Sequence, residues 1–290
     1  MRKSAGVLVA ALCGALLLSA CDDGAPPLTP TGQSRPSATA SAAGPASTAS
    51  PQVQARIEAA RSAYRTGNFQ QALSEAQEGI KLDNRNADVH YLAGNAFNQL
   101  GGVTADAGTR ATLFQNAVTA YQRAIELDPR KDEALTNLAT VYYQNGQLDD
   151  AQKRIEQALA INPTDATSHY VLGTIFLQRS PGTAGETTDK AAKEFEAAIK
   201  SDPNFSAAYT GLATVYLFRA DFKNALDNAK KGVDLRGAQQ DPFALWALAQ
   251  AQCGTGDTAG GGRTLAAVLA FNVPDARFRG EVQKLQAGCK

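Results

Sequence analysis

Side chains that could carry out chemistry are few in this sequence and widely scattered. Its only histidines, His90 and His169, are 79 residues apart, and its four cysteines include no Cys-x-x-Cys pair with a histidine nearby. Metal sites and nucleophilic catalytic sets need such side chains grouped at short or matched spacings. The sequence therefore predicts no enzyme activity, no cofactor and no metal site.

Two further kinds of ligand site are disfavoured. Gly254, Gly256 and the run 260–262 superficially resemble a phosphate-binding loop, but a preceding strand and the lysine are missing, so we expect a loose turn between helices. The 28 basic and 28 acidic side chains balance, and no basic stripe interrupts that balance. This charge pattern excludes the electrostatic footprint of a nucleic-acid-binding protein.

The N-terminus has the layout of a secretory signal. Arg2 and Lys3 precede an apolar run from Ala5 to Leu18, which is too short for a comfortable membrane span. Residues 18–21, Leu-Ser-Ala-Cys, resemble the bacterial lipobox. The resemblance implies a signal peptide over 1–20, a lipid on Cys21, and a chain anchored to a bacterial membrane, with its folded part outside the cytoplasm (periplasm or cell surface). An ordinary signal peptide with an incidental cysteine, or an uncleaved anchor, is the alternative.

The segment after the anchor is predicted to be a tether. Residues 22–52 are almost entirely Pro, Ala, Ser, Thr and Gly, without apolar periodicity. Such a composition cannot bury enough apolar surface to offset its ordering entropy, so we expect disorder throughout 21–52. A flexible coil of this length averages roughly 30 Å from end to end.

A 34-residue pattern recurs from about Val53 onward. Its clearest copy is 132–165, which closes at Asn162-Pro163, one period after Asp128-Pro129. Small residues recur in one column of the first predicted helix of each copy and in one column of the second, where two helices must approach closely. The columns are Ala60, Gly94, Ala139, Gly173, Ala213 and Ala249, and Ala72, Ala117, Ala151, Ala191, Ala225 and Gly261.

This pattern resembles the tetratricopeptide repeat, a helix–turn–helix unit of that period. The resemblance implies an all-α fold, a right-handed superhelical solenoid occupying 53–290. We expect about six units, at 53–86, 87–131, 132–165, 166–205, 206–239 and 242–275, with Gly67, Gly101, Gly146 and Gly256 at the turns inside units. Extra residues after Gly101 and after Ser180 are expected at such turns.

In that family the first helices of the units line a concave groove. Their Asn, Thr and Gln side chains can bond an extended backbone, and aromatic rings give large contact area. The basic residues of the family's carboxylate clamp are missing here, since the third unit has Thr136, Thr140 and Gln144. The groove residues implied are Ile57, Arg61, Tyr64, Tyr91, Asn95, Asn98, Thr136, Thr140, Tyr143, Tyr170, Thr174, Leu177, Gln178, Thr210, Thr214, Leu217, Phe218 and Trp246.

The C-terminal residues 275–289 predict one amphipathic helix that caps the solenoid, with Phe278, Val282 and Leu285 on its apolar face. In the repeat geometry that the resemblance implies, Cys289 comes level with Cys253. We therefore predict a disulfide between them in an oxidising envelope; two buried free thiols are the alternative.

These features together favour a scaffold or assembly factor that binds protein partners, as an extended peptide or a helix, beside a membrane. The architecture resembles that of repeat lipoproteins such as the pilotins of type IV pili. A cell-wall glycan-binding lipoprotein or a regulator of cell-wall enzymes is the alternative, and self-association through the two turn insertions also stays open. Fold alone does not choose between them.

Overall fold

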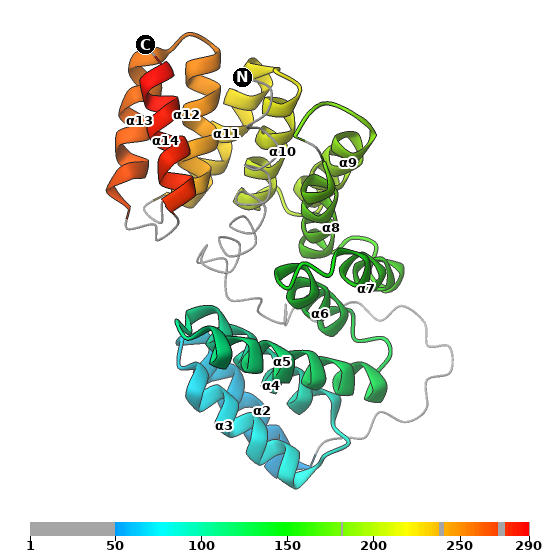
Figure 1. Cartoon of the computed structure of the whole chain (residues 1–290). Coiled ribbons are helices and arrows are strands. Elements are labelled where there is room, and N and C mark those ends of the chain that lie inside the picture. Colours follow the sequence, from blue (N-terminus) through cyan, green and yellow to red (C-terminus); the bar gives the residue numbers. More distant parts are fainter. Residues whose placement is uncertain (1–49, 181, 238–240, 272–275, 290) are drawn as a thin grey trace. The chain divides into compact units, whose positions relative to one another are not determined.

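The computed structural model describes residues 50–180, 182–237, 241–271 and 276–289. The predicted signal peptide, the lipidation site Cys21 and nearly all of the predicted tether lie outside these residues. All regular structure in the described part is helical (Figure 1). The helices are α2 (Pro51–Arg65), α3 (Phe69–Leu82), α4 (Ala87–Val103), α5 (Ala107–Leu127), α6 (Asp132–Gln144), α7 (Leu148–Ile161), α8 (Ala166–Arg179), α9 (Glu186–Ser201), α10 (Ser206–Phe218), α11 (Phe222–Arg236), α12 (Pro242–Gly254), α13 (Thr258–Ala270) and α14 (Ala276–Gly288).

The chain divides into two compact units at Gly146, in the turn between α6 and α7. We call described residues 50–145 the N-terminal unit and described residues from 146 onward the C-terminal unit. The division falls inside the third predicted repeat, 132–165. Each unit is described by itself below.

Short polar side chains fix where most of the helices begin. Ser50, with Pro51 at the first helical position, accepts a hydrogen bond from the Val53 amide, and Asp106 accepts one from Thr109 at the start of α5. Asp165 and Asp221 do the same for α8 and α11. Such caps satisfy backbone amides that have no partner inside the helix.

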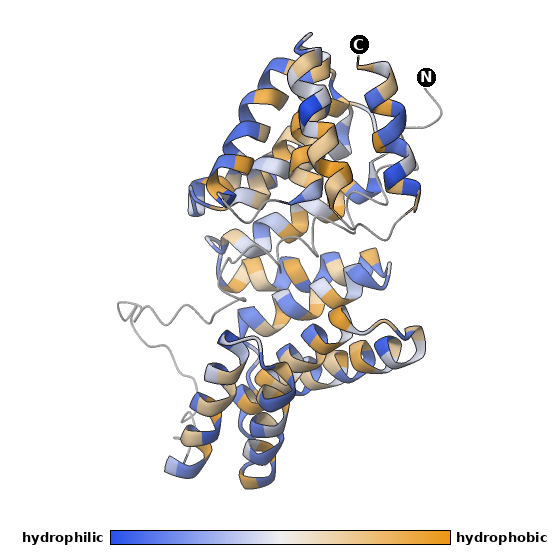
Figure 2. Ribbon diagram, turned by 90° about the vertical axis from the view of Figure 1, so that its left-hand side faces the viewer, coloured by the Kyte–Doolittle hydropathy of each residue, from blue (hydrophilic) through white to orange (hydrophobic). Residues whose placement is uncertain are grey.

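The small-residue columns are buried, as predicted. All twelve positions are less than a tenth exposed, and most are fully buried. Large rings fill the space that they leave: the Tyr121 ring lies against Gly94, and the fully buried Phe195 ring lies against both Gly173 and Gly211. Figure 2 shows hydrophilic and hydrophobic residues sharing each helix, which is the pattern that such one-sided packing requires.

The turns between the two helices of each predicted repeat contain the predicted glycines, with one exception. Gly67, Gly146 and Gly256 have φ of +75°, +76° and +89°, a left-handed conformation that glycine adopts without steric cost. The prediction for Gly101 was wrong, because this residue lies within α4 and packs against the Phe114 ring. The extra residues of the second predicted repeat lengthen α4 and α5 to 17 and 21 residues instead of forming a loop.

One turn uses a different residue at the same step of the repeat. Gly146 follows Ala139 of the small-residue column by seven positions, and Ala220 follows Ala213 of that column by the same seven positions. The φ of Ala220 is +56°. A β-carbon is unfavourable in this conformation, so Ala220 holds local strain.

Candidate protein-binding face

The first helices of the predicted repeats are α2, α4 and α6 in the N-terminal unit and α8, α10 and α12 in the C-terminal unit. We call the predicted groove residues that they carry, together with Gln144 of α6, the first-helix face. The face proves less open than the sequence suggested. In the N-terminal unit Arg61 and Asn98 are half-buried, while the following are buried: Ile57, Tyr64, Tyr91, Asn95, Thr136, Thr140 and Tyr143.

The C-terminal unit repeats this distribution. Gln178, Leu217 and Phe218 are half-buried. The buried members are Tyr170, Thr174, Leu177, Thr210, Thr214 and Trp246. The aromatic rings of the face, Phe218 excepted, are therefore used mainly in packing.

Threonine hydroxyls on this face donate hydrogen bonds within their own helices. Each donates to the carbonyl four residues earlier, at oxygen–oxygen distances of 2.8–3.4 Å. The residues are Thr136, Thr140, Thr174, Thr210 and Thr214. A hydroxyl has one hydrogen to donate but two lone pairs, so these side chains keep only the ability to accept.

Sequence reasoning missed a buried polar cluster in the N-terminal unit. The Asn95 Oδ1 accepts hydrogen bonds from the Tyr121 hydroxyl at 2.9 Å and from Asn137 Nδ2 at 2.8 Å. Asn137 Nδ2 also lies 3.5 Å from the Tyr91 hydroxyl oxygen. The clue was present in the sequence: Asn137 lies next to Leu138 and within two residues of Leu135, in a helix whose spacing predicts a buried side.

A charged pair adjoins this cluster. The Lys131 ammonium lies 2.5 Å from Asp88 and 5.2 Å from the centre of the Tyr91 ring. The position over the ring adds a favourable cation–π contact. Burial raises the pKa of the Tyr91 phenol well above its ordinary value, so the ring stays neutral.

Three amides supply acceptors that have no hydrogen-bond partner within the described part of the chain. They are Asn98 Oδ1 and Gln144 Oε1 in the N-terminal unit and Gln178 Oε1 in the C-terminal unit. All three belong to first helices, four or five residues after the small-residue column (Gly94, Ala139 and Gly173). A buried acceptor without a donor costs free energy that a bound donor would recover.

The other chemistry-bearing residues have structural roles. His169 bridges Glu194 and the Pro163 carbonyl, at 2.7 Å and 3.0 Å, and His90 lies 3.0 Å from the Asn84 carbonyl. Cys253 and Cys289 are joined by a disulfide. Among the described residues, no three acidic, histidine or cysteine side chains gather as a metal site would require, and no helix is long and apolar enough to cross a bilayer.

Comparison with known proteins identifies the repeat. Two models of the tetratricopeptide repeat match, over residues 57–129 and 111–174. This is a tetratricopeptide-repeat protein. The predicted all-α repeat fold is thereby confirmed, and proteins built from this repeat bind other proteins.

Similar proteins span several functional settings. The repeat-containing protein YpiA of Bacillus subtilis is 25% identical over 178 residues, which cover 60% of this chain and 37% of YpiA. Hsp70-Hsp90 organizing protein 1 of Glycine max is 36% identical over 87 residues, covering 30% of this chain and 15% of that protein. The match thus spans well under half the length of either relative.

Among solved structures, PilF of Pseudomonas aeruginosa superposes with a TM-score of 0.65. The two chains are 18% identical, and the superposition covers 82% of this chain and 97% of PilF. At that identity the likeness shows a shared fold and leaves the partner of this tetratricopeptide-repeat protein to be argued from its own residues.

Proposed function

We propose that this tetratricopeptide-repeat protein is a non-catalytic scaffold of the bacterial cell envelope, anchored by a lipid on Cys21. Each of its two units binds extended segments of partner proteins along its own part of the first-helix face. The observation that carries the binding proposal is the set of acceptors left without donors at Asn98, Gln144 and Gln178.

The hydrogen-bonding balance of the face favours an extended partner over a helical one. Its threonine hydroxyls already donate their hydrogen to carbonyls of their own helices, so they can only accept a hydrogen bond from a partner. The amide oxygens without a donor are acceptors as well. The complementary chemistry for these oxygens is a donor, while Arg61 Nε on the same face lacks an acceptor among the described residues. An extended backbone offers free N–H groups, whereas the N–H groups inside a helix are already bonded.

The face gives less support to the alternative of glycan binding. Sugar rings stack on exposed aromatic faces, but Tyr64, Tyr91, Tyr143, Tyr170 and Trp246 are all less than a tenth exposed. Sedimentation of the protein with purified peptidoglycan tests this alternative directly, and retention of the chain on peptidoglycan would favour it over the scaffold.

Site-specific photo-crosslinking in cells tests the binding proposal. A photo-reactive amino acid is placed at Gln178 on α8, within the face, or at the exposed Lys193 on the neighbouring helix α9. We expect discrete protein adducts from position 178 and not from the matched control at 193. Adducts of the same proteins from both positions, or none from 178, would contradict binding along this face.

The anchor is tested separately. Cells grown with an alkyne analogue of palmitate should label the wild-type chain, and Cys21→Ala should abolish the label. Cys13→Ala is the matched control, because Cys13 lies inside the apolar run and fits the lipobox poorly. Label retained by Cys21→Ala would refute the lipid assignment and leave the binding proposal standing.

A further inference from the structure

Helix α14 covers an apolar face of the C-terminal unit. Its Phe278 and Val282 are buried, and Leu285 is partly buried against the same cluster. The Phe278 ring lies 4.7 Å from the Phe243 ring and 5.5 Å from the Trp246 ring, centre to centre. We call the surface beneath it, Phe243, Trp246, Leu265 and Val268 of α12 and α13, the covered face.

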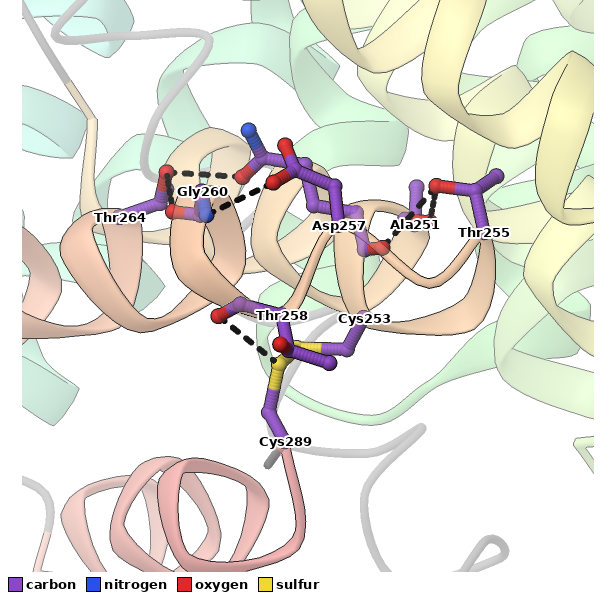
Figure 3. The surroundings of a disulfide bond; sticks show 9 residues. Ala251, Cys253, Thr255, Asp257, Thr258, Gly260, Thr264 and Cys289 are labelled. Atoms are coloured by element: carbon purple, nitrogen blue, oxygen red, sulfur yellow. Dashed lines mark hydrogen bonds between the residues drawn. A yellow bond between two sulfur atoms is a disulfide. The ribbon is translucent and has the colours of Figure 1, made fainter.

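A covalent bond holds the far end of this cover. Cys253, near the end of α12, is bonded to Cys289, one residue after α14, and their Cα atoms are 5.4 Å apart (Figure 3). Gly261 of α13 makes room for the bond, since a β-carbon there would lie 2.5 Å and 2.9 Å from the two sulfur atoms. The packing is therefore built around a disulfide rather than around two apolar side chains.

Glycines weaken the helical structure of α14 and of the helix that supports it. The covering helix buries Phe278 and Val282, but it contains Gly280, around which nothing lies within reach of a β-carbon. The supporting helix α13 includes three successive glycines, 260–262, each of which disfavours a helix relative to alanine.

The covered face also keeps one polar group unsatisfied beneath α14. Trp246 is only 2% exposed, and its Nε1 has no acceptor in the part of the chain that the structure describes. An indole N–H buried in this way loses its hydrogen bond to water without replacement. The closed position of α14 therefore carries a penalty that release would remove.

We propose that the Cys253–Cys289 bond is a redox latch: a dithiol reductant opens it, α14 then leaves, and the covered face becomes exposed. A thiolate of the reductant attacks the sulfur of Cys253, because Cys253 is the more accessible of the two cysteines: it is half-buried, while Cys289 is buried with 9% of its surface exposed. The mixed disulfide forms at Cys253, and Cys289 departs as a thiolate and takes up a proton. The second thiol of the reductant resolves the intermediate, so the reductant ends as a disulfide and this chain as two thiols.

The sequence provides a single reporter for this motion. Trp246 is the only tryptophan in the chain, and it lies directly beneath α14. On adding dithiothreitol to the native protein, we expect its emission to shift to longer wavelength and its quenching by acrylamide to increase. Loss of the tether lowers the ratio of closed to open α14 by roughly 100-fold or more.

Two variants and two parallel measurements make the test decisive. Cys253→Ser/Cys289→Ser should show the shifted emission without reductant and no response to it, while Gly280→Ala should reduce the shift by favouring helical α14. Thiol titration verifies reduction, and circular dichroism should lose helix equivalent to α14 alone.

Three results would overturn the latch. Unchanged Trp246 emission and quenching with both thiols titrated would mean that packing alone holds α14. A disulfide that dithiothreitol reduces only in urea would mean that no reductant reaches it in the native protein. Loss of helix well beyond the 13 residues of α14 would mean that the bond supports the whole unit rather than its cover.

Discussion

Replacing Gly211 with alanine tests how tightly the C-terminal unit is packed. A β-carbon at this position would lie 2.6, 2.7 and 2.9 Å from three atoms of the Phe195 ring. That ring is fully buried and also contacts Gly173, so it cannot move aside. Overpacking of this kind costs about 1–3 kcal/mol, and the better helix propensity of alanine returns up to about 1 kcal/mol. We expect Gly211→Ala to lower the free energy of unfolding by about 1–2 kcal/mol.

Urea unfolding of matched variants measures this effect. Gly262→Ala is the control, because nothing lies within 4 Å of the β-carbon that it would add, and it should raise stability by up to about 1 kcal/mol. Shortening the ring, Phe195→Leu, should remove most of the penalty of Gly211→Ala, giving a coupling energy of about 1 kcal/mol. Equal stabilisation by Gly211→Ala and Gly262→Ala would refute the close approach of α9 and α10.

Three further variants test particular contacts. Ala220→Gly should raise stability by about 0.5–1 kcal/mol in urea unfolding, because it relieves a backbone with φ of +56°. Tyr121→Phe should lower it by about 1 kcal/mol, since Asn95 loses one of its two buried donors. The hydrogen bond with Glu194 raises the pKa of His169 above its ordinary 6.5, so the contribution of this ion pair is present below that pH and is lost as the pH rises through the folded-state pKa. Unfolding measured between about pH 5 and pH 9 should show this loss in the wild type and not in His169→Gln.

The repeat period and the small-residue columns were predictable because they report direct contacts between neighbouring helices. Ala213 and Ala225 are fully buried where α10 and α11 pack against each other, which is the reason given from spacing alone. Gly101 was not predictable in this way. Whether a glycine ends a helix depends on what packs against it, and the Phe114 ring from the next helix lies on Gly101 within α4.

The positions of the face residues were predictable, but their availability was not. Residue type shows that Thr140 and Thr214 are polar; it does not show that each hydroxyl donates within its own helix. Likewise, Asn95 was expected to bond the backbone of a bound peptide, but in the structure its side-chain oxygen accepts hydrogen bonds from Tyr121 and Asn137. These outcomes depend on side-chain rotamers, which helix periodicity does not specify.

Glycines inside the helices of this chain differ in what packs against them, and this difference bears on the stability of α13 and α14. Gly94, Gly173 and Gly211 admit buried rings, so the helix propensity that they sacrifice is recovered in packing. Gly262 and Gly280 face open space and recover nothing. Gly262 lies in α13 and Gly280 in α14, and the disulfide joins the end of α12 to the residue after α14. Stability in a repeat array is approximately the sum of the stabilities of its repeats and of their interfaces. A crosslink closing a 36-residue separation contributes about 4 kcal/mol in the loop-entropy model, which exceeds the roughly 2 kcal/mol that these two glycines cost. The disulfide therefore offsets the weak helix propensity of α13 and α14, and under the proposed latch the packing of α14 depends on the redox state of its surroundings.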